Sequence, residues 1–300
     1  MIDSPGIYDL QMDAYQADPC EIPSLTRGII KMLINECPQK AYFAHPRFNP
    51  GLVEQNKKAW DLGSTVHSML LEGTDIADCL DFDSWRTNAS KDAAAKSREN
   101  GKIPLLVKDY ENVKAVVVAA EEHLFESELH IASLQAEGYS EQSYIWTEGE
   151  TWCRTRPDWV SSDTKIMIDL KTTGLSADPS NYVRQILAAG TDTQAAFYLR
   201  GVKKLTKLEP RFVTMVQEIN PPYLCSFISL SSQFMELGKQ KVKEGMAIWK
   251  ECIETGIWPG YSKRIMQCDA PAYAVAQFED RKFTAELLAQ DANSEDGMPF

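Results

Sequence analysis

The stretch that decides the fold is TWCRTRPDWV (residues 151–160), followed after a short turn by KIMIDLKTT (residues 165–173). Residues 151–160 alternate polar and apolar side chains, and the first part of the second segment is a short apolar run. Ser161, Ser162 and Asp163 between them are typical turn residues. The sequence therefore predicts two adjacent antiparallel strands joined as a hairpin.

Two carboxylates and a lysine lie at the end of this predicted hairpin. Cross-strand pairing brings Asp158 close to Asp169, and Lys171 shares a face with Asp169 because residues i and i+2 of a strand point the same way. Carboxylate oxygens suit Mg²⁺, and also Mn²⁺. A lysine beside them can orient or deprotonate a water molecule and can balance negative charge. The alternative is an ordinary hairpin in which Lys171 pairs with Asp169 on the surface.

Five segments of the chain follow one another in an informative order. They are residues 63–72 (GSTVHSMLLE), 141–146 (EQSYIW), 156–158 (RPD), 168–173 (IDLKTT) and 194–198 (QAAFY). In these segments the chain resembles the PD-(D/E)xK nuclease superfamily, in particular the RecE-type (exodeoxyribonuclease VIII-like) exonucleases of phages and prophages and the RecB-type nuclease domains. The resemblance implies an α/β fold with a mixed central sheet flanked by helices, and metal-dependent cleavage of a phosphodiester bond.

The same resemblance assigns metal ligands. It makes His67, Asp158 and Asp169 ligands of the ion, together with the backbone carbonyl of Leu170. His67 lies in a predicted helix beside the small residues at 63–65, which permit close packing. A single histidine in a helix is otherwise more often a core or surface residue, so the ligand role rests on the family pattern.

A second helix carries the next candidate pair. Gln194 and Tyr198 are four residues apart in the predicted helix 191–201, so they share one side. The resemblance identifies them as the Q-x-x-x-Y motif, which borders the active site, contacts DNA or orients the lysine. The alternative is an amphipathic helix whose Tyr198 packs on the sheet.

Further charged residues flank the predicted hairpin. Glu141 could supply a carboxylate for a second metal ion, although an acidic residue at a strand edge is usually only solvated. Arg154 and Arg156 lie two apart on one strand face, where they grip phosphate or balance nearby acids. Ser24 is a candidate N-cap, and with Arg27 it could bind a terminal 5′ phosphate at the helix N-terminus. A plain cap with a solvated arginine is the alternative.

The composition allows one large α/β domain. The chain has 300 residues, 44% of them hydrophobic, and no linker-like segment divides it, so we expect a single domain over residues 1–285. Residues 286–300 are polar and acidic and predict a disordered tail. Residues 91–102 are highly charged and predict a mobile loop or a frayed helix. The net charge of −12 argues against a protein that coats nucleic acid, but a nuclease needs only a local basic channel.

The cysteines and the hydropathy pattern indicate in which cellular compartment the protein is expected. Seven cysteines without a C-x-x-C pair indicate reduced thiols in a cytoplasmic protein. Cys252 and Cys268 do not reproduce the cysteine spacing of the iron–sulfur relatives, so no such cluster is expected. No segment has the pattern of a secretion signal or of a membrane span.

The predicted element order describes an α/β sandwich. Helices are expected at residues 24–35, 56–72 and 105–127, and then strands at 139–147, 151–160 and 165–170. Helices at 179–188 and 191–201, strands at 211–218 and 223–229, and a closing helix at 232–255 complete the order. A mixed sheet with helices on both sides follows from this order.

The sequence and the resemblance together predict a Mg²⁺-dependent 5′-to-3′ exonuclease that acts on the ends of linear double-stranded DNA and leaves 3′ single-stranded tails. The resemblance alone implies a ring-shaped homo-oligomer, a tetramer, and a single-strand annealing protein as partner. Two alternatives remain: an endonuclease of the same superfamily, and a phage protein that binds DNA or metal without catalysis.

Overall fold

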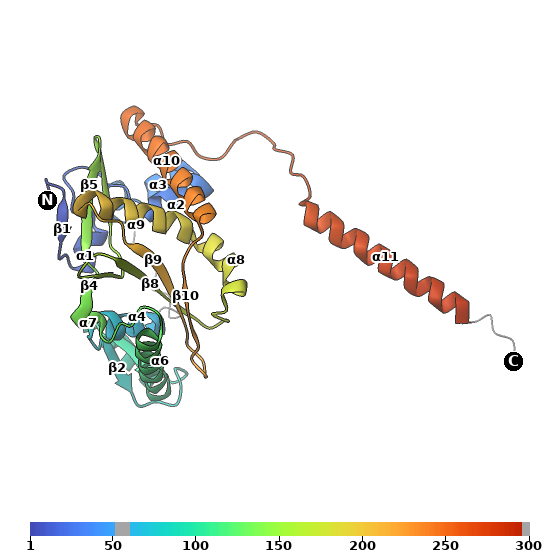
Figure 1. The fold of residues 1–300 in the computed structure, drawn as a ribbon, viewed down its shortest axis with the longest axis horizontal. Coiled ribbons are helices and arrows are strands. Elements are labelled where there is room, and N and C mark those ends of the chain that lie inside the picture. Colours follow the sequence, from blue (N-terminus) through green and yellow to red (C-terminus); the bar gives the residue numbers. More distant parts are fainter. Residues whose placement is uncertain (52–60, 296–300) are drawn as a thin grey trace. The chain divides into compact units, whose positions relative to one another are not determined.

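The computed structural model describes residues 1–51 and 61–295. The chain forms two compact units, residues 1–260 and residues 261–300, and the second unit carries helix α11 (Ala272–Glu295) (Figure 1). The sequence predicted one domain over residues 1–285 and a tail from residue 286. The first compact unit instead ends at Gly260, and α11 continues through residues 286–295.

Within the described residues, the first unit holds a central five-stranded sheet and two smaller sheets. The central sheet has the order β10-β9-β8-β7-β4, in which only the β8–β9 pair is parallel. Antiparallel β1-β5-β6 and the parallel pair β2-β3 form the others. The strands are β1 (Gly6–Tyr8), β2 (Ala77–Leu80), β3 (Ile103–Leu106), β4 (Gly138–Ser140), β5 (Ser143–Glu148), β6 (Thr151–Thr155), β7 (Trp159–Ser161), β8 (Ile166–Thr173), β9 (Arg211–Glu218) and β10 (Cys225–Ile228).

Two predicted strands are each divided in the structure. The expected strand 139–147 is β4 followed by β5, and the expected strand 151–160 is β6 followed by β7. In both cases the chain leaves one sheet and joins the other, since β4 pairs with β7 while β5 pairs with β6. Pro157 has no amide hydrogen to donate, and Glu141 has a left-handed backbone (φ 56°), so both breaks have local causes.

Helices cover both faces of the central sheet (Figure 1). On one face, α2 (Arg27–Asn35), α9 (Thr191–Thr206) and α10 (Ser232–Thr255) build a core that includes Met167 of β8. On the other face, α4 (Asp61–His67), a following π-helix (Ser68–Glu72) and α6 (Val107–Glu126) pack on Ile168 and Leu170. This alternation along β8 places Asp169 and Lys171 on the α9 side.

Several elements differ from the sequence prediction. The expected helix 105–127 begins as β3 and continues as α6, and the charged segment around 91–102 is the regular helix α5 (Asn88–Glu99), capped by the Thr87 side chain. Of the expected helix 56–72, residues 56–60 lie outside the described residues. The remaining helices are α1 (Met12–Gln16), α3 (Pro38–Ala44), α7 (Leu134–Glu137) and α8 (Pro179–Ala189). None of the described helices is long and apolar enough to cross a bilayer.

Candidate active site

Two acidic residues stand where the chain crosses between sheets. Glu141 follows β4 and Asp158 precedes β7, and the Glu141 amide donates to the Asp158 carbonyl at 3.1 Å. This hydrogen bond ties the two crossovers together. The left-handed backbone of Glu141 is uncommon for a residue with a Cβ, and such conformations concentrate at functional sites.

Helix α4 brings a histidine to these acids. A Cβ on Gly63 would lie 2.8 Å from the Thr172 Oγ1, so glycine lets α4 approach β8 this closely without displacing that side chain. One turn later, His67 Nε2 lies 3.3 Å from Asp158 Oδ2, and its Nδ1 lies 3.5 Å from Glu141 Oε1. The small residue predicted to allow close packing therefore places the imidazole between the two carboxylates.

The donor atoms of His67, Glu141 and Asp158 suit a divalent cation. One ligand atom from each residue lies within 4.8 Å of the others, a grouping of one imidazole and two carboxylates that fits Mn²⁺ and Mg²⁺. Burial and the neighbouring charge of Asp158 raise the pKa of Glu141. The pKa of His67 is also raised: burial opposes its protonation, but the hydrogen bond and charge of Asp158 outweigh that effect. A bound cation would relieve this crowding of negative charge.

As the hairpin predicted, Asp158, which directly precedes β7, lies beside Asp169 of the neighbouring strand β8. The Leu170 amide donates to Asp158 Oδ2 at 2.8 Å, directly beside Asp169. Burial raises the pKa of Asp169, with a further contribution from Asp158, whereas the pKa of Asp158 is lowered because Lys171 and His67 outweigh its burial. Asp169 itself is outside the three-residue ligand group. Its buried Oδ2 has no hydrogen-bond partner among the described residues, which leaves that oxygen free for a ligand.

The other oxygen of Asp169 accepts hydrogen bonds from two candidate residues. Oδ1 accepts from Lys171 Nζ at 2.5 Å and from Gln194 Nε2 at 2.6 Å. Burial disfavours the charged form of Lys171, but Asp169 and Asp158 outweigh it and raise its pKa. Lys171 is therefore protonated at neutral pH and serves as a cation next to the site. A protonated Lys171 fits the charge-balancing role predicted for it.

The two α9 candidates lie on one side of their helix but in different surroundings. Gln194 reaches the active-site carboxylate Asp169, as its hydrogen bond shows. Tyr198 belongs to the apolar core between α2, α9 and the sheet, and burial raises its pKa to about 12. The ring of Tyr198 thus packs in the core, yet its hydroxyl is close enough to Asp158 and Asp169 for their charges to raise its pKa further, and Gln194 joins the polar centre directly.

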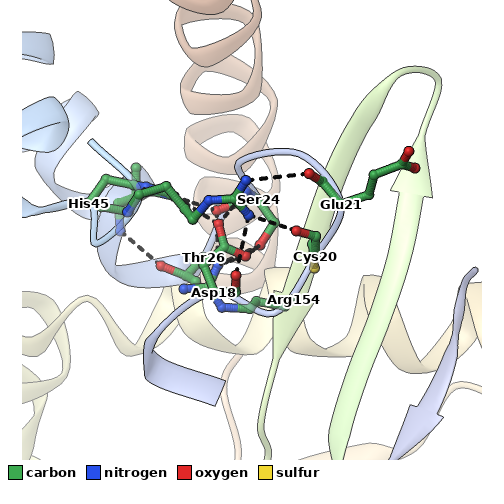
Figure 2. Close-up of polar contacts among 9 residues, drawn as sticks. Asp18, Cys20, Glu21, Ser24, Thr26, His45 and Arg154 are labelled. Carbon is green, nitrogen blue, oxygen red and sulfur yellow. Dashed lines mark hydrogen bonds and ion pairs between the residues drawn. The ribbon is translucent and has the colours of Figure 1, made fainter. Parts of the chain in front are cut away.

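Ser24 and Arg154 were predicted to bind DNA, and the structure places them elsewhere (Figure 2). Both are buried, and Arg154 Nη1 contacts Asp18 Oδ1 at 2.9 Å and the Ser24 carbonyl at 3.1 Å. Ser24 also donates from its hydroxyl to Asp18 Oδ1 at 2.7 Å. The expected N-cap at Ser24 is wrong as well, because Thr26 caps α2 through the Ile29 amide. The two residues hold the N-terminal segment instead of presenting donors to phosphate.

The remaining arginines stay close to the candidate centre. Arg156 donates from Nε to Glu141 Oε2 at 2.5 Å and from Nη1 to the Leu10 carbonyl at 2.5 Å. It therefore links a candidate metal ligand to the N-terminal segment. Arg27, half-buried at the start of α2, donates to the Ala189 carbonyl at 3.4 Å and lies near enough to Asp169 to lower its pKa.

Sequence reasoning missed the contribution of the N-terminal segment. The ring of Tyr15 lies beneath the guanidinium groups of Arg154 (5.4 Å) and Arg156 (5.9 Å). Asp18 has a left-handed backbone (φ 62°) and is the buried counter-ion of Arg154. No spacing within residues 1–20 signals these contacts, since each one joins residues more than a hundred positions apart.

Comparisons with known proteins agree with this geometry. Residues 30–271 match the family described as "PDDEXK-like domain of unknown function (DUF3799)". No curated protein matches the chain. This family match covers every one of the candidate residues except Ser24 and Arg27, and it supports a nuclease.

Solved structures share the fold at low sequence identity. A crystal structure of an inferred exonuclease from Eubacterium rectale is similar with a TM-score of 0.59 and 12% identity, over 89% of this chain and 98% of that one. A crystal structure designated SSO0001 aligns with a TM-score of only 0.30 and 12% identity, over 81% of this chain and 89% of that one. The first likeness confirms the predicted α/β architecture. From the extent of the family match, the chain belongs to the PDDEXK-like DUF3799 family, within the PD-(D/E)xK superfamily.

Proposed function

We propose that the protein is a Mg²⁺-dependent exonuclease that degrades one strand of linear double-stranded DNA from its 5′ end. The observation that carries the proposal is the arrangement of His67, Glu141 and Asp158 around one point, directly beside the Asp169–Lys171 pair. Three ligands for a divalent ion next to the half-buried Lys171 cation match what phosphodiester cleavage requires: an activated water and a neutralised phosphate.

Each residue of the centre has a distinct role in this proposal. His67, Glu141 and Asp158 hold the metal ion, and the free Oδ2 of Asp169 is the further oxygen available to it. A divalent ion bound there lowers the pKa of a coordinated water and neutralises charge on the phosphate. Lys171, kept protonated by Asp169, stabilises the negative charge that develops on the phosphate oxygens. Gln194 keeps the Asp169 carboxylate in position through its 2.6 Å hydrogen bond.

The arginines divide between positioning and DNA binding. Arg156 fixes the carboxylate of Glu141, so it is a positioning residue. Arg27 is the better candidate for a terminal 5′ phosphate, because it is partly accessible at the N-terminus of α2 and close to Asp169. The backbone carbonyl of Leu170, 3.5 Å from Lys171 Nζ, remains a further ligand candidate.

The resemblance supports the biological setting of the proposal. The 3′ single-stranded tails left by such an enzyme are the substrate of strand annealing, so a single-strand annealing protein is the proposed partner. A ring-shaped tetramer that encircles the DNA would keep the enzyme on its substrate. Because the overall charge is −12, contact with DNA must rely on local cations such as Arg27 and on the bound metal.

The experiment that tests the function follows linear duplex DNA labelled at either the 5′ or the 3′ end, with closed circular DNA in parallel. In Mg²⁺ we expect the 5′ label to be released first as short products, while the circle stays intact. Asp158→Asn should abolish the release. Nicking of the circle would replace the proposal with an endonuclease, and release of the 3′ label first would reverse the polarity. Absence of cleavage in both Mg²⁺ and Mn²⁺ would leave only a binding protein.

A further inference from the structure

Helix α11 exposes large apolar side chains along its length. Every residue from 261 to 286 is exposed, and α11 presents Tyr273 (69%), Val275 (45%), Phe278 (60%) and Phe283 (63%) to solvent. Large apolar side chains exposed in number mark interaction sites, because their burial against a partner is favourable. A 24-residue helix with this surface therefore calls for a partner.

The sequence at the middle of α11 is self-complementary. Residues 278–283 read Phe-Glu-Asp-Arg-Lys-Phe, with two acids followed by two bases between two phenylalanines. A two-fold axis between Asp280 and Arg281, perpendicular to the helix, exchanges position 278 with 283 and position 279 with 282. Under this operation Glu279 of one copy faces Lys282 of the other, and Phe278 faces Phe283.

One face of the helix carries the residues that this symmetry would bring together. Phe278, Glu279, Lys282 and Phe283 are linked by spacings of three and four residues, and Val275 extends the same face by one turn. Lys282 Nζ lies over the Phe278 ring, 5.0 Å from its centroid, so these two side chains lie together on this face. Asp280 and Arg281 point away from this face because of the helical period.

We infer that α11 pairs in antiparallel fashion with α11 of a second copy of this chain through the face formed by Val275, Phe278, Glu279, Lys282 and Phe283. Phe278 packs on Phe283 of the second copy, and Glu279 pairs with Lys282 of the second copy, twice in each dimer. A parallel pairing in register would place Glu279 against Glu279, which is repulsive. The charge order thus selects the antiparallel dimer, and the apolar residues supply its buried area.

The test measures self-association of the full chain by sedimentation velocity over a range of micromolar concentrations. Wild type should show concentration-dependent self-association, in which pairing through α11 is a step separate from the proposed tetramer. Glu279→Lys and Lys282→Glu should each weaken the dimer about tenfold or more, since both ion pairs become like-charge contacts. An equimolar mixture of these two variants should regain dimer, because the two lysines of the first variant then face the two glutamates of the second. The double variant E279K/K282E should also dimerise like wild type.

Matched controls separate this interface from a general effect of charge. Asp280→Lys and Arg281→Glu make the same charge changes on the other side of the helix and should leave the dimer unchanged. Circular dichroism of each variant verifies that α11 keeps its helix. Wild type that stays monomeric throughout, or equal effects at 279 and 280, would overturn the inference. Failure of the mixture to regain dimer would overturn the antiparallel pairing.

Discussion

Asp169 links the residues of the candidate centre. Its Oδ1 accepts hydrogen bonds from Lys171 and Gln194, while its Oδ2 has no partner among the described residues. We predict that Lys171→Ala and Asp169→Ala each reduce the rate of DNA cleavage by about 10²-fold or more, the usual cost of removing a group that stabilises transition-state charge. Initial rates on end-labelled duplex DNA measure this.

The same hairpin provides the control for that measurement. Lys165 is exposed and pairs with Asp163 at 2.9 Å in the turn between β7 and β8, away from the candidate ligands. Lys165→Ala should cleave at the wild-type rate. Wild-type activity in Lys171→Ala, or equal losses in both lysine variants, would contradict the assignment.

The buried cluster around Arg154 predicts a pH dependence of stability. His45 is fully buried, and burial lowers its pKa, so the folded state keeps it neutral while the unfolded state binds a proton near pH 6.5. Its contribution to stability is therefore complete above about pH 6.5 and is lost as the pH falls.

The variant His45→Gln isolates this contribution. Glutamine can still donate to the Ser24 carbonyl, which His45 Nε2 contacts at 3.0 Å, but it does not titrate. The free energy of unfolding, from urea titrations between about pH 7.5 and 5.5, should fall more steeply for wild type than for this variant. Parallel curves would show that His45 does not bind a proton on unfolding.

Several roles at the residue scale were accessible from sequence, and others were not. The closeness of Asp158 to Asp169 followed from the predicted hairpin, and the side of α9 shared by Gln194 and Tyr198 followed from helical spacing. The closeness of Glu141 to His67 did not follow, because it depends on a left-handed residue at a crossover between sheets. The burial of Arg154 depends on Asp18, a contact over more than a hundred positions.

At the scale of elements, α9 and α10 pack in close contact at a glycine. A Cβ on Gly238 would lie 2.1 Å from the Asp192 carbonyl oxygen, which is backbone and cannot move aside. Gly238→Ala should therefore destabilise the protein by about 1–3 kcal/mol, more than the helix propensity that alanine adds. Displacement of α9 should also lower the cleavage rate, since Gln194 lies on this helix.

A second glycine gives the matched comparison. Gly28 in α2 has only the Thr26 side chain near its missing Cβ, at 3.8 Å. Gly28→Ala should leave the unfolding free energy unchanged or raise it by up to about 1 kcal/mol. Thermal and denaturant unfolding of the two variants measure the difference. Equal stability of the two alanine variants would contradict the close packing of α9 on α10.

Element boundaries show where local sequence patterns stop being informative. The strand at 211–218 and the helix at 232–255 were predicted with the bounds that the structure has. The strand is a mostly apolar run between charged ends, and helical spacing runs uninterrupted through the helix. The strands that contain Glu141 and Asp158 were each predicted as one element. Pro157 marks one of these breaks in the sequence, whereas the left-handed backbone of Glu141 cannot be read from its residue type.

At the scale of the whole molecule, the chain consists of two compact units joined through the exposed segment 261–271. Lys263 and Arg264 lie in that segment, and exposed irregular segments are preferred sites of proteolysis. Brief trypsin treatment under native conditions should cleave there before it cleaves the described helices and strands of the first unit. Mass spectrometry of the products locates the cut.

The product of that cleavage retains all candidate site residues, so it should still degrade linear DNA at a rate close to that of the intact chain. It should also lose the self-association attributed to α11. Loss of DNA cleavage at the same time as the cut would show that the second unit contributes to catalysis.

The fold class was predictable because ordered motifs and alternating helices and strands constrain the architecture strongly. The division at residue 260 was not, since residues 261–271 carry no glycine-rich or serine-rich linker composition. Helix α11 itself was not predicted, because over its full length the apolar residues give little helical periodicity.

The central claim is that His67, Glu141 and Asp158 share one divalent ion next to Lys171. Anomalous scattering from a crystal grown with Mn²⁺ tests it most directly. The account predicts one strong peak within coordination distance, about 2.0–2.4 Å, of ligand atoms from all three residues. The absence of a peak there, or a peak coordinated by other residues while these three stay apart from it, would contradict the account.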